Sequence, residues 1–254
     1  MKELSMKNNK PVALITGGSK GIGLEAVKRF VSLGYQVVTC SRQATVWLEK
    51  VKEFSNLADV DYLALDISLE VDRDRLFSHV EKQYSHLDVV INNASPTLES
   101  SGPYEDQENR ALEHTLMQDF WAHATCLKQA LSMMKKGGAI VNMSSINGFR
   151  ATPNAAMYSA CKHAIEGLTR SVAIEAIGKG VRVNAVAPGV TWTPRWELRA
   201  QDTPDLRANV SAQVPAKRFA HEAEIVDAVE FLTSKKASYI VGHTLVVDGG
   251  LSLI

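Results

Sequence analysis

The amino-acid sequence predicts an α/β fold in which a parallel β-sheet is covered by helices on both faces. Short apolar runs of strand length alternate with longer segments of helical periodicity, and this alternation is typical of successive βαβ units. The chain has 254 residues, of which 45% are hydrophobic and 22% charged, enough to bury one sizeable core. It contains no internal repeat or long linker, so we expect one doubly wound domain over residues 1–254.

Seven segments are predicted to be strands. They are VALIT (12–16), YQVVTC (35–40), YLALD (62–66), DVVIN (88–92), AIVNMS (139–144), VRVNAVA (181–187) and TLVVDGG (244–250). The crossovers between parallel strands should be right-handed. Ligands of such sheets bind beyond the carboxyl ends of the strands, so motifs that follow strand ends carry the most weight.

Two long helices and two polar loops are predicted between these strands. We expect helices over about 107–135 and 156–178, and loops over 95–110 and 188–218. Because both loops follow strand ends, either could border a ligand site. The charged start, residues 1–10, is expected to be a flexible N-terminal extension.

The charge balance argues against a nucleic-acid partner. Basic and acidic residues number 28 each, and there is no basic block of the kind that neutralises phosphates. The first residues lack the apolar core of a signal peptide, and no run approaches the roughly 18 apolar residues of a membrane span. We therefore expect a cytoplasmic protein that binds a small molecule and no membrane.

The cysteines and histidines do not predict a metal site. Cys40, Cys126 and Cys161 lack CxxC spacing, and the seven histidines form no HExxH motif. An odd number of cysteines without a pairing pattern also gives no disulfide framework. We expect the three cysteines to be small core residues.

A glycine-rich turn directly follows the first predicted strand. VALIT continues into GGSKGIG (17–23) and then into the helical run LEAVKRFVSLGY. Glycines let the backbone approach a ligand closely, and a helix N-terminus offers free N–H groups to a pyrophosphate. The order of strand, turn and helix predicts a dinucleotide site, the alternative being a tight structural turn. The turn residues expected to bind the cofactor are Gly17, Ser19, Lys20, Gly21, Ile22 and Gly23.

The end of the second predicted strand favours NADP(H) over NAD(H). An acidic residue there would accept the ribose hydroxyls of NAD, but the chain has CSRQ, with Arg42. A second cation, Lys20, lies in the glycine turn. Since a guanidinium can bind a 2′-phosphate through two parallel hydrogen bonds, the two cations suit NADP(H). The alternative is that both are solvated loop residues.

The segment YSACK (158–162) is the candidate for catalysis. Tyr158 and Lys162 are four residues apart, so on a helix both could point into one cleft. The ammonium group would then favour the phenolate and lower the tyrosine pKa from about 10 toward a value useful for proton transfer. Tyrosine and lysine at this spacing also occur on many solvated helices, so the pair alone does not decide.

Five motifs in one order resemble those of a known family. They are TGGSKGIG (16–23), NNAS (92–95), NMSSING (142–148), YSACK (158–162) and NAVAPGVTWT (184–193). From about residue 11 to its end the chain resembles the short-chain dehydrogenase/reductase family, in particular the NADPH-dependent ketoreductases typified by 3-oxoacyl-(acyl-carrier-protein) reductase. The resemblance implies a Rossmann-like sheet of seven parallel strands. The segment GHTLVVDGG (242–250) is similar to the last strand of tetrameric members.

The resemblance also implies catalytic roles. Tyr158 would be the general acid in reduction and the base in oxidation, and Lys162 would hold the nicotinamide ribose hydroxyls and lower the Tyr158 pKa. Ser145, thirteen residues before the tyrosine, would hydrogen-bond the substrate carbonyl in preference to Ser144. The nicotinamide would deliver hydride to the carbonyl carbon as Tyr158 protonates the developing alkoxide.

Further positions would contact the cofactor by the same resemblance. Four of them would lie near the adenine and ribose: Asp66, Ile67, Asn92 and Ala94. Four more belong to the segment that would face the carboxamide and phosphates: Pro188, Gly189, Thr191 and Thr193. Asp66, at the end of the third predicted strand, would meet the adenine amino group. Thr191 and Thr193 would face the carboxamide and the phosphates. For each position the alternative is a satisfied turn or cap residue.

Two positions depart from the family pattern. The catalytic asparagine of the family falls on Asp119, and its usual NNAG is NNAS here, with Ser95. In the family this asparagine helps to hold a water joined to the lysine, so a carboxylate of similar size could still serve. It could equally perturb the proton relay, because an ionised aspartate accepts hydrogen bonds but donates none. Ser95 would narrow the space beside the nicotinamide. Pteridine reductases share this serine, but this chain lacks their arginine in the glycine turn and their aspartate in place of the catalytic serine.

Substrate specificity in the family resides in the loop after Gly189. In this chain that loop, 188–218, contains Trp192, Arg195, Trp196, Arg199 and Arg207. Two tryptophans flanking an arginine could bind a flat or hydrophobic substrate with a carboxylate or phosphate. Alternatively, the arginines are solvated and the tryptophans cover the helix beneath.

Three functions stay open from the sequence. The leading hypothesis is an NADPH-dependent ketoreductase that acts on a ketone or 3-oxoacyl compound. The alternatives are an alcohol dehydrogenase of the same fold, working oxidatively with NAD, and a dinucleotide-binding sensor or scaffold that has lost its chemistry. Because members of the family pair through their long helices, we expect a homotetramer or homodimer.

Overall fold

The computed structural model describes residues 10–96 and 98–254, which fold around a seven-stranded sheet. Its strands are β1 (Val12–Thr16), β2 (Gln36–Ser41), β3 (Asp61–Ala64), β4 (Leu87–Asn92), β5 (Met134–Met143), β6 (Arg182–Pro188) and β7 (Thr244–Val247). All seven predicted strands are present. The expected N-terminal extension lies outside the described residues, apart from Lys10.

The strand order is β3-β2-β1-β4-β5-β6-β7, and all neighbouring strands are parallel. This confirms the predicted Rossmann-like sheet. The direction of winding reverses between β1 and β4, so the carboxyl ends of these two strands flank the crevice in which such sheets bind ligands. The glycine turn follows β1, and the NNAS motif follows β4.

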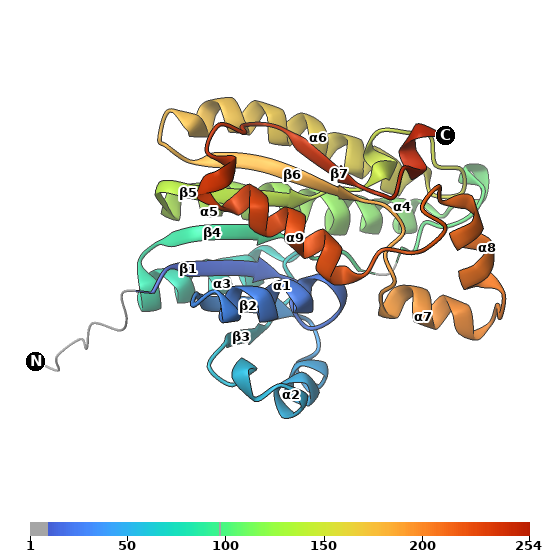
Figure 1. Cartoon of the computed structure of the whole chain (residues 1–254). Helices are drawn as coiled ribbons and strands as arrows, with labels where there is room; N and C mark the ends of the chain where they lie inside the picture. Colours follow the sequence, from blue (N-terminus) through green and yellow to red (C-terminus); the bar gives the residue numbers. More distant parts are fainter. Residues whose placement is uncertain (1–9, 97) are drawn as a thin grey trace, which may run out of the picture.

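Helices cover both faces of this sheet (Figure 1). The α-helices of the described residues are α1 (Gly21–Ser32), α2 (Ala44–Glu53), α3 (Glu70–Tyr84), α4 (Asn109–Leu116), α5 (Ala122–Met133), α6 (Ala156–Ile177), α7 (Pro194–Gln201), α8 (Leu206–Gln213) and α9 (Glu222–Thr233). In Figure 1, α1 and α9 lie in front of the sheet, whereas α7 and α8 lie beyond the carboxyl ends of the strands.

The two faces of the sheet form separate apolar cores. Side chains alternate across a strand, so Val12 and Leu14 of β1 pack on one face, with α3, α5 and α6. Ala13 and Ile15 pack on the other face, with α1 and α9. Every residue of β1 is buried, as expected for a central parallel strand that is covered on both sides.

Three expectations about secondary structure were wrong in detail. Segment 188–218 is not a continuous loop, because it contains α7 and α8; Pro194 occupies the first turn of α7, where a missing N–H does no harm. The helix expected over 107–135 is interrupted by a π-helical turn at Met117–Trp121. Strand β3 ends at Ala64, so Asp66 lies in the following turn rather than in the strand.

The three cysteines are free and buried, as predicted. Burial raises the pKa of Cys40 to about 12 and that of Cys161 to about 11. Both thiols are therefore protonated near neutral pH, which suits core residues rather than nucleophiles.

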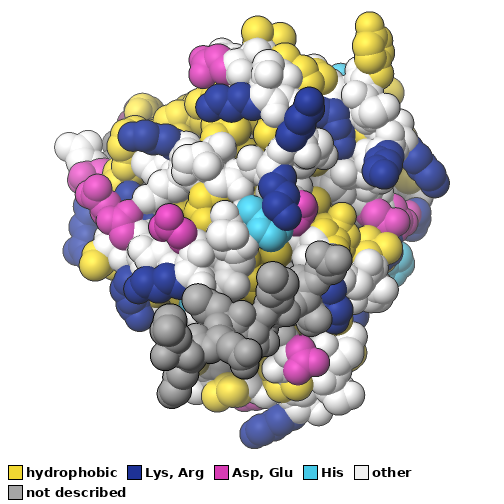
Figure 2. All heavy atoms as spheres, turned by 90° about the vertical axis from the view of Figure 1, so that its left-hand side faces the viewer, with side chains coloured by type: hydrophobic (Ala, Val, Ile, Leu, Met, Phe, Trp, Pro, Cys, Tyr) yellow, Lys and Arg dark blue, Asp and Glu magenta, His cyan; other side chains and the backbone are white. Residues whose placement is uncertain are grey.

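The surface at the amino ends of the strands carries charges of both signs. Figure 2 shows lysine and arginine side chains interspersed with aspartate and glutamate on this face, which lies away from α7 and α8. Among the described helices, none is both long and apolar enough to cross a bilayer.

Candidate active site

The glycine turn forms a cradle in which side chains are sterically excluded. Gly17 has φ +75°, and a Cβ atom there would lie 2.8 Å from Cα of Ala94. A Cβ at Gly23 would collide with the carbonyl oxygen of Gly17. Helix α1 begins at Gly21, and Lys20 at its N-cap provides no side-chain cap, which leaves the N–H groups of the first turn open to an anion. The turn therefore fits the pyrophosphate of a dinucleotide.

Lys20 and Arg42 are both exposed, one in the turn after β1 and one directly after β2. Strands β1 and β2 are neighbours in the sheet, and Thr16 pairs with Cys40 at their carboxyl ends. The two cations thus follow adjacent strand ends, where the adenosine ribose of a dinucleotide lies in folds of this type. Their positions suit a 2′-phosphate.

Asp66 and Ile67 form a tight turn after β3. The Asp66 carboxylate accepts hydrogen bonds from the backbone N–H (2.9 Å) and the hydroxyl (2.7 Å) of Ser68. The carbonyl oxygen of Ile67 accepts a hydrogen bond from the buried Arg73 (2.7 Å). The hydrogen bonds of its carboxylate agree with the alternative interpretation, in which Asp66 only stabilises the turn. A contact of Asp66 with adenine stays a prediction.

The NNAS motif after β4 is tied to β1 and β5. Asn92 is buried, and its amide donates to Oδ1 of Asn142 (2.9 Å), so this side chain holds two strands together. The hydroxyl oxygen of Thr16 accepts hydrogen bonds from the backbone N–H groups of Asn93 (3.0 Å) and Ala94 (3.1 Å). Asn93 also donates from its side chain to the carbonyl of Thr16 (3.0 Å), and sequence analysis missed this residue although it lies in the motif.

Tyr158 and Lys162 lie on the first turns of α6, and Ser145 lies in the turn that follows β5. Lys162 is buried, donates to the carbonyl of Met143 (3.1 Å) and places its ammonium 5.4 Å from the centre of the Tyr158 ring. Ser145 caps a short 3₁₀ turn, Ile146–Gly148, with its hydroxyl oxygen 3.2 Å from the N–H of Asn147. The spacing argument for one face of a helix therefore holds for the Tyr158–Lys162 pair.

The turn after Ser145 is fixed on the first turn of α6. The hydroxyl of Ser159, next to Tyr158, donates to the carbonyl of Asn147 (2.8 Å) and lies 3.3 Å from that of Arg150. A Cβ at Gly148 would come within 3.0 Å of the carbonyl oxygen of Lys162, so a glycine allows this close packing. The turn after Ser145 is therefore anchored to the start of the helix that carries Tyr158.

Asp119 lies in the π-helical turn and faces Lys162. Both side chains are buried, and Oδ1 of Asp119 lies 3.9 Å from Nζ of Lys162. The same oxygen accepts a hydrogen bond from the hydroxyl of Ser95 (2.6 Å). The two departures from the family pattern are thus in direct contact with each other.

Arg195 of α7 connects the segment after β6 to Ser95. Its Nη2 donates to the backbone carbonyls of Ser95 (2.9 Å) and Pro96 (2.7 Å) and lies 3.4 Å from the Ser95 hydroxyl. Sequence analysis considered this arginine either a substrate ligand or a solvated residue, and the structure shows it bound within the protein. A chain of contacts therefore runs from α7 through Ser95 and Asp119 to Lys162.

His123 is a buried residue of this site that sequence analysis missed. His123 lies one helical turn after Asp119, and its Nε2 donates to the carbonyl of Ala94 (2.6 Å). Burial, and then the nearby charge of Lys162, lower the pKa of His123 to about 3. The imidazole is therefore neutral near neutral pH and adds no positive charge beside the lysine.

The segment after β6 packs closely on itself and on the glycine turn. Thr193 approaches Gly21, where a Cβ would lie 3.6 Å from Cγ2 of Thr193, and Thr191 is buried. The rings of Trp192 and Trp196 each pack edge-on against Phe219, at 5.1 Å between ring centres. Cation–π contacts complete this cluster: Arg207 lies 4.3 Å from Trp192, and Arg199 lies 4.6 Å from Trp196. The tryptophans therefore serve mainly as packing residues.

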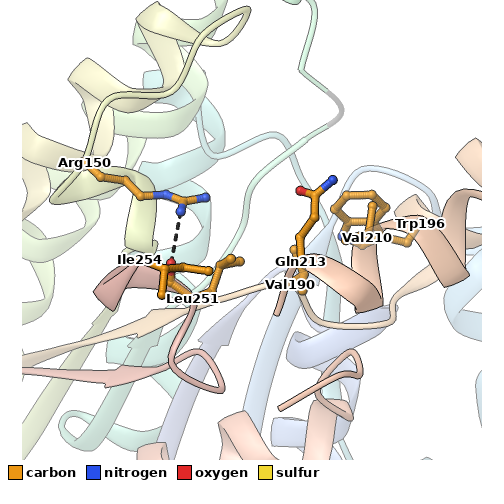
Figure 3. A pocket seen from close by; sticks show the side chains of 7 residues that line it. All are labelled: Arg150, Val190, Trp196, Val210, Gln213, Leu251 and Ile254. Carbon is orange, nitrogen blue, oxygen red and sulfur yellow. Dashed lines mark hydrogen bonds between the residues drawn. The ribbon is translucent and has the colours of Figure 1, made fainter. Parts of the chain in front are cut away.

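A cavity of about 520 Å³ lies between this segment and the turn after Ser145. Val190, Trp196, Val210 and Leu251 give it apolar walls, and Gln213 and Arg150 add polar groups. Figure 3 shows Arg150 and Leu251 on one side of the cavity and Trp196 with Gln213 on the other. Within the described residues, no cluster of acidic, histidine or cysteine side chains is arranged to bind a metal ion.

Comparison with known proteins places this arrangement among oxidoreductases. Residues 17–252 match the family described as Enoyl-(Acyl carrier protein) reductase. L-fucose dehydrogenase of Mus musculus is 34% identical over 246 residues, which cover 95% of this chain and 88% of that protein. The 3-oxoacyl-(acyl-carrier-protein) reductase FabG of Staphylococcus aureus is 32% identical, over 94% of this chain and 97% of that protein.

Solved structures include a similar chain with a bound cofactor. A variant of actinorhodin polyketide ketoreductase with NADPH superposes with a TM-score of 0.89 at 27% identity, covering 96% of this chain and 98% of that one. The similarity therefore extends over the whole sheet and the helices that flank the site.

Proposed function

The chain belongs to the short-chain dehydrogenase/reductase family, and we propose that it is an NADPH-dependent ketoreductase that converts a ketone to a secondary alcohol. The observation that carries this proposal is the buried Lys162 beside Tyr158, with the turn after Ser145 hydrogen-bonded to the start of the same helix. A solvated helix pair would not place a lysine ammonium in the protein interior, since burying an unneeded charge is unfavourable.

Each residue of this group has a distinct proposed role. Tyr158 donates its phenolic proton to the carbonyl oxygen of the substrate, and Ser145 donates a hydrogen bond to the same oxygen. The ammonium of Lys162 balances the negative charge left on Tyr158. NADPH, when bound, supplies the hydride.

The cradle after β1 would hold the cofactor. Gly17, Gly21 and Gly23 would admit the pyrophosphate to the N-terminus of α1, and Lys20 and Arg42 would bind the 2′-phosphate. The remaining proposed contacts are Ser19, Ile22, Asp66, Ile67, Asn92, Ala94, Pro188, Gly189, Thr191 and Thr193. The ketoreductase of similar structure is described with NADPH, which supports the choice of cofactor.

Alcohol oxidation is a second candidate, favoured by the relative named L-fucose dehydrogenase. The same residues serve in reverse, with Tyr158 as the base. Because equilibrium and not geometry sets the direction, both directions require assay, with NADP(H) and with NAD(H).

The decisive experiment combines cofactor titration with a turnover screen. Fluorescence titration should show NADPH binding at least about tenfold tighter than NADH, because two cations face the 2′-phosphate. Wild-type protein should then consume NADPH with at least one member of a panel of ketones and 3-oxoacyl thioesters. Tyr158→Phe should still bind NADPH but lose about 10²–10⁴-fold in turnover. Binding without turnover across the panel would favour the sensor or scaffold.

We also propose that the chain assembles as a homotetramer or homodimer through its long helices. Exposed apolar side chains occur on the helices in question, at Leu116, Trp121, Ile174 and Ile177. Surfaces of this kind are commonly covered by a partner. Sedimentation at micromolar concentration should show an oligomer, and a monomer would contradict the proposal.

A further inference from the structure

Arg150 is placed where it can bind part of the substrate. It follows Ser145 by five residues. Its backbone carbonyl lies 3.3 Å from the hydroxyl of Ser159, the residue next to Tyr158 in the chain. Its side chain points into the cavity opposite Trp196 and Gln213 (Figure 3). A substrate that presents its carbonyl to Ser145 and Tyr158 would therefore extend toward Arg150.

The guanidinium of Arg150 has unused hydrogen-bonding capacity. Nη1 donates to the carbonyl of Leu251 (3.2 Å), and Nε is buried without a hydrogen-bond partner among the described residues. A guanidinium has five N–H donors, and burial of an unpartnered donor is unfavourable. Nη2 also forms no hydrogen bond among the described residues and, unlike Nε, is not enclosed, so a ligand in the cavity could accept from it.

Arg150 forms no ion pair with Asp248, the acidic residue whose charge interacts with it. The carboxylate of Asp248 accepts hydrogen bonds from the backbone N–H groups of Gly250 (2.9 Å) and Ser252 (2.6 Å), one on each oxygen. Asp248 thus interacts with the guanidinium only through space. The cavity combines this cation with the apolar walls formed by Val190, Val210 and their neighbours.

From these observations we propose that the substrate carries a carboxylate, which Arg150 binds at the far end of an apolar body. The planar guanidinium can bind a carboxylate through two parallel hydrogen bonds, and an apolar surrounding strengthens this interaction. The arginines that the sequence suggested for this role, Arg195, Arg199 and Arg207, are engaged with backbone carbonyls or tryptophan rings. This inference rests on the proposed ketoreductase function for the position of the reacting carbonyl.

The first test measures binding without turnover. Calorimetry on protein saturated with NADP⁺ would compare a series of saturated carboxylates with the corresponding amides. Wild-type protein should bind the best carboxylate at least about tenfold tighter than its amide, because only the carboxylate pairs with the charge. Arg150→Gln should abolish this preference, and Arg150→Lys should retain part of it. Arg75→Gln, which removes an exposed arginine of α3, is the control for the charge change.

The second test measures turnover with oxo-carboxylates and their methyl esters. The wild-type kcat/KM should be at least about tenfold higher for the acid, and Arg150→Gln should lower it to the value for the ester. Equal rates for acid and ester, or an unchanged preference in Arg150→Gln, would overturn the inference and leave the ketoreductase intact. Selective carboxylate binding that is lost in Arg150→Gln, without reduction of any ketone, would refute the proposed function and leave the Arg150 site standing. NADPH binding by each variant serves as the test that the variant has folded. If Arg150→Gln no longer binds NADPH, Arg150→Lys is used in its place.

Discussion

The contact between Ser95 and Asp119 allows a quantitative test of whether Asp119 acts as a charged group. The hydroxyl of Ser95 lies 2.6 Å from Oδ1 of Asp119, and that oxygen lies 3.9 Å from the ammonium of Lys162. A hydrogen bond to a charged acceptor contributes about 1.5–3 kcal/mol, whereas a neutral one contributes about 0.5–1.5 kcal/mol. Ser95→Ala should therefore lower the free energy of unfolding by about 1.5–3 kcal/mol.

The charge of Asp119 is isolated by repeating this change in the Asp119→Asn background. Asparagine keeps an acceptor for Ser95 but carries no charge, so Ser95→Ala should then remove only about 0.5–1.5 kcal/mol. The difference between the two backgrounds, about 1–1.5 kcal/mol, is the expected coupling energy. Urea unfolding of the four proteins at one protein concentration, followed by tryptophan fluorescence, measures it.

A matched control lies in the same segment of the chain. Ser100 is buried, and its hydroxyl is bonded to that of Thr115 (2.8 Å), a neutral pair. Ser100→Ala should therefore lower the free energy of unfolding equally in both Asp119 backgrounds. If Ser95→Ala also gives equal losses, within about 0.3–0.5 kcal/mol, Asp119 is not acting as a charged acceptor and the reasoning fails.

Three further predictions concern the glycine turn, the buried histidine and the link to α7. Gly23→Ala brings a methyl group against the carbonyl oxygen of Gly17, so it should lower the free energy of unfolding by about 1–3 kcal/mol. It should also weaken NADPH binding in a fluorescence titration, and an unchanged affinity would argue against the cradle. The pKa of His123 is about 3 in the folded protein, below its ordinary value of 6.5. Between pH 6.5 and 3 the imidazole is therefore protonated in the unfolded chain but not in the folded protein, so stability is lost as the pH falls from 6.5 toward 3. Urea unfolding between pH 7 and 5 should show a loss approaching about 1.4 kcal/mol per pH unit below 6.5, and a shallower loss in His123→Gln, which keeps a donor for Ala94; equal slopes would contradict the assignment. Arg195→Met removes two hydrogen bonds to the segment after β4, so it should raise KM more than it lowers kcat. It should also speed proteolysis within 188–218, and an unchanged rate of proteolysis would show that these hydrogen bonds do not hold α7 in place.

Local patterns in the sequence were sufficient for the sheet and for the proposed catalytic pair. Strand β1 is a run of five buried residues followed at once by glycines, and both features depend on neighbours in the chain. Tyr158 and Lys162 are related by one helical turn, so helical geometry alone brings them to one face. Short-range rules of this kind can be read without knowing what lies across the fold.

Contacts between distant segments required the tertiary structure. Ser95 and Asp119 are 24 residues apart and Arg195 is 100 residues from Ser95, so no spacing rule predicts that they touch. The polar composition of segment 188–218 resembles a loop because α7 and α8 are short and bury no residue fully; their helical form depends on packing against the rest of the protein.

The same distinction separates the residue types of the site from their partners. The sequence suggested Arg195, Arg199 and Arg207, together with two tryptophans, for an anionic substrate. In the fold these three arginines contact backbone carbonyls or tryptophan rings, whereas Arg150 faces the cavity. Local sequence determines which elements form and which side chains each one carries. Which side chains meet is decided by the packing of those elements, because the contact energies involve residues that are far apart in the chain.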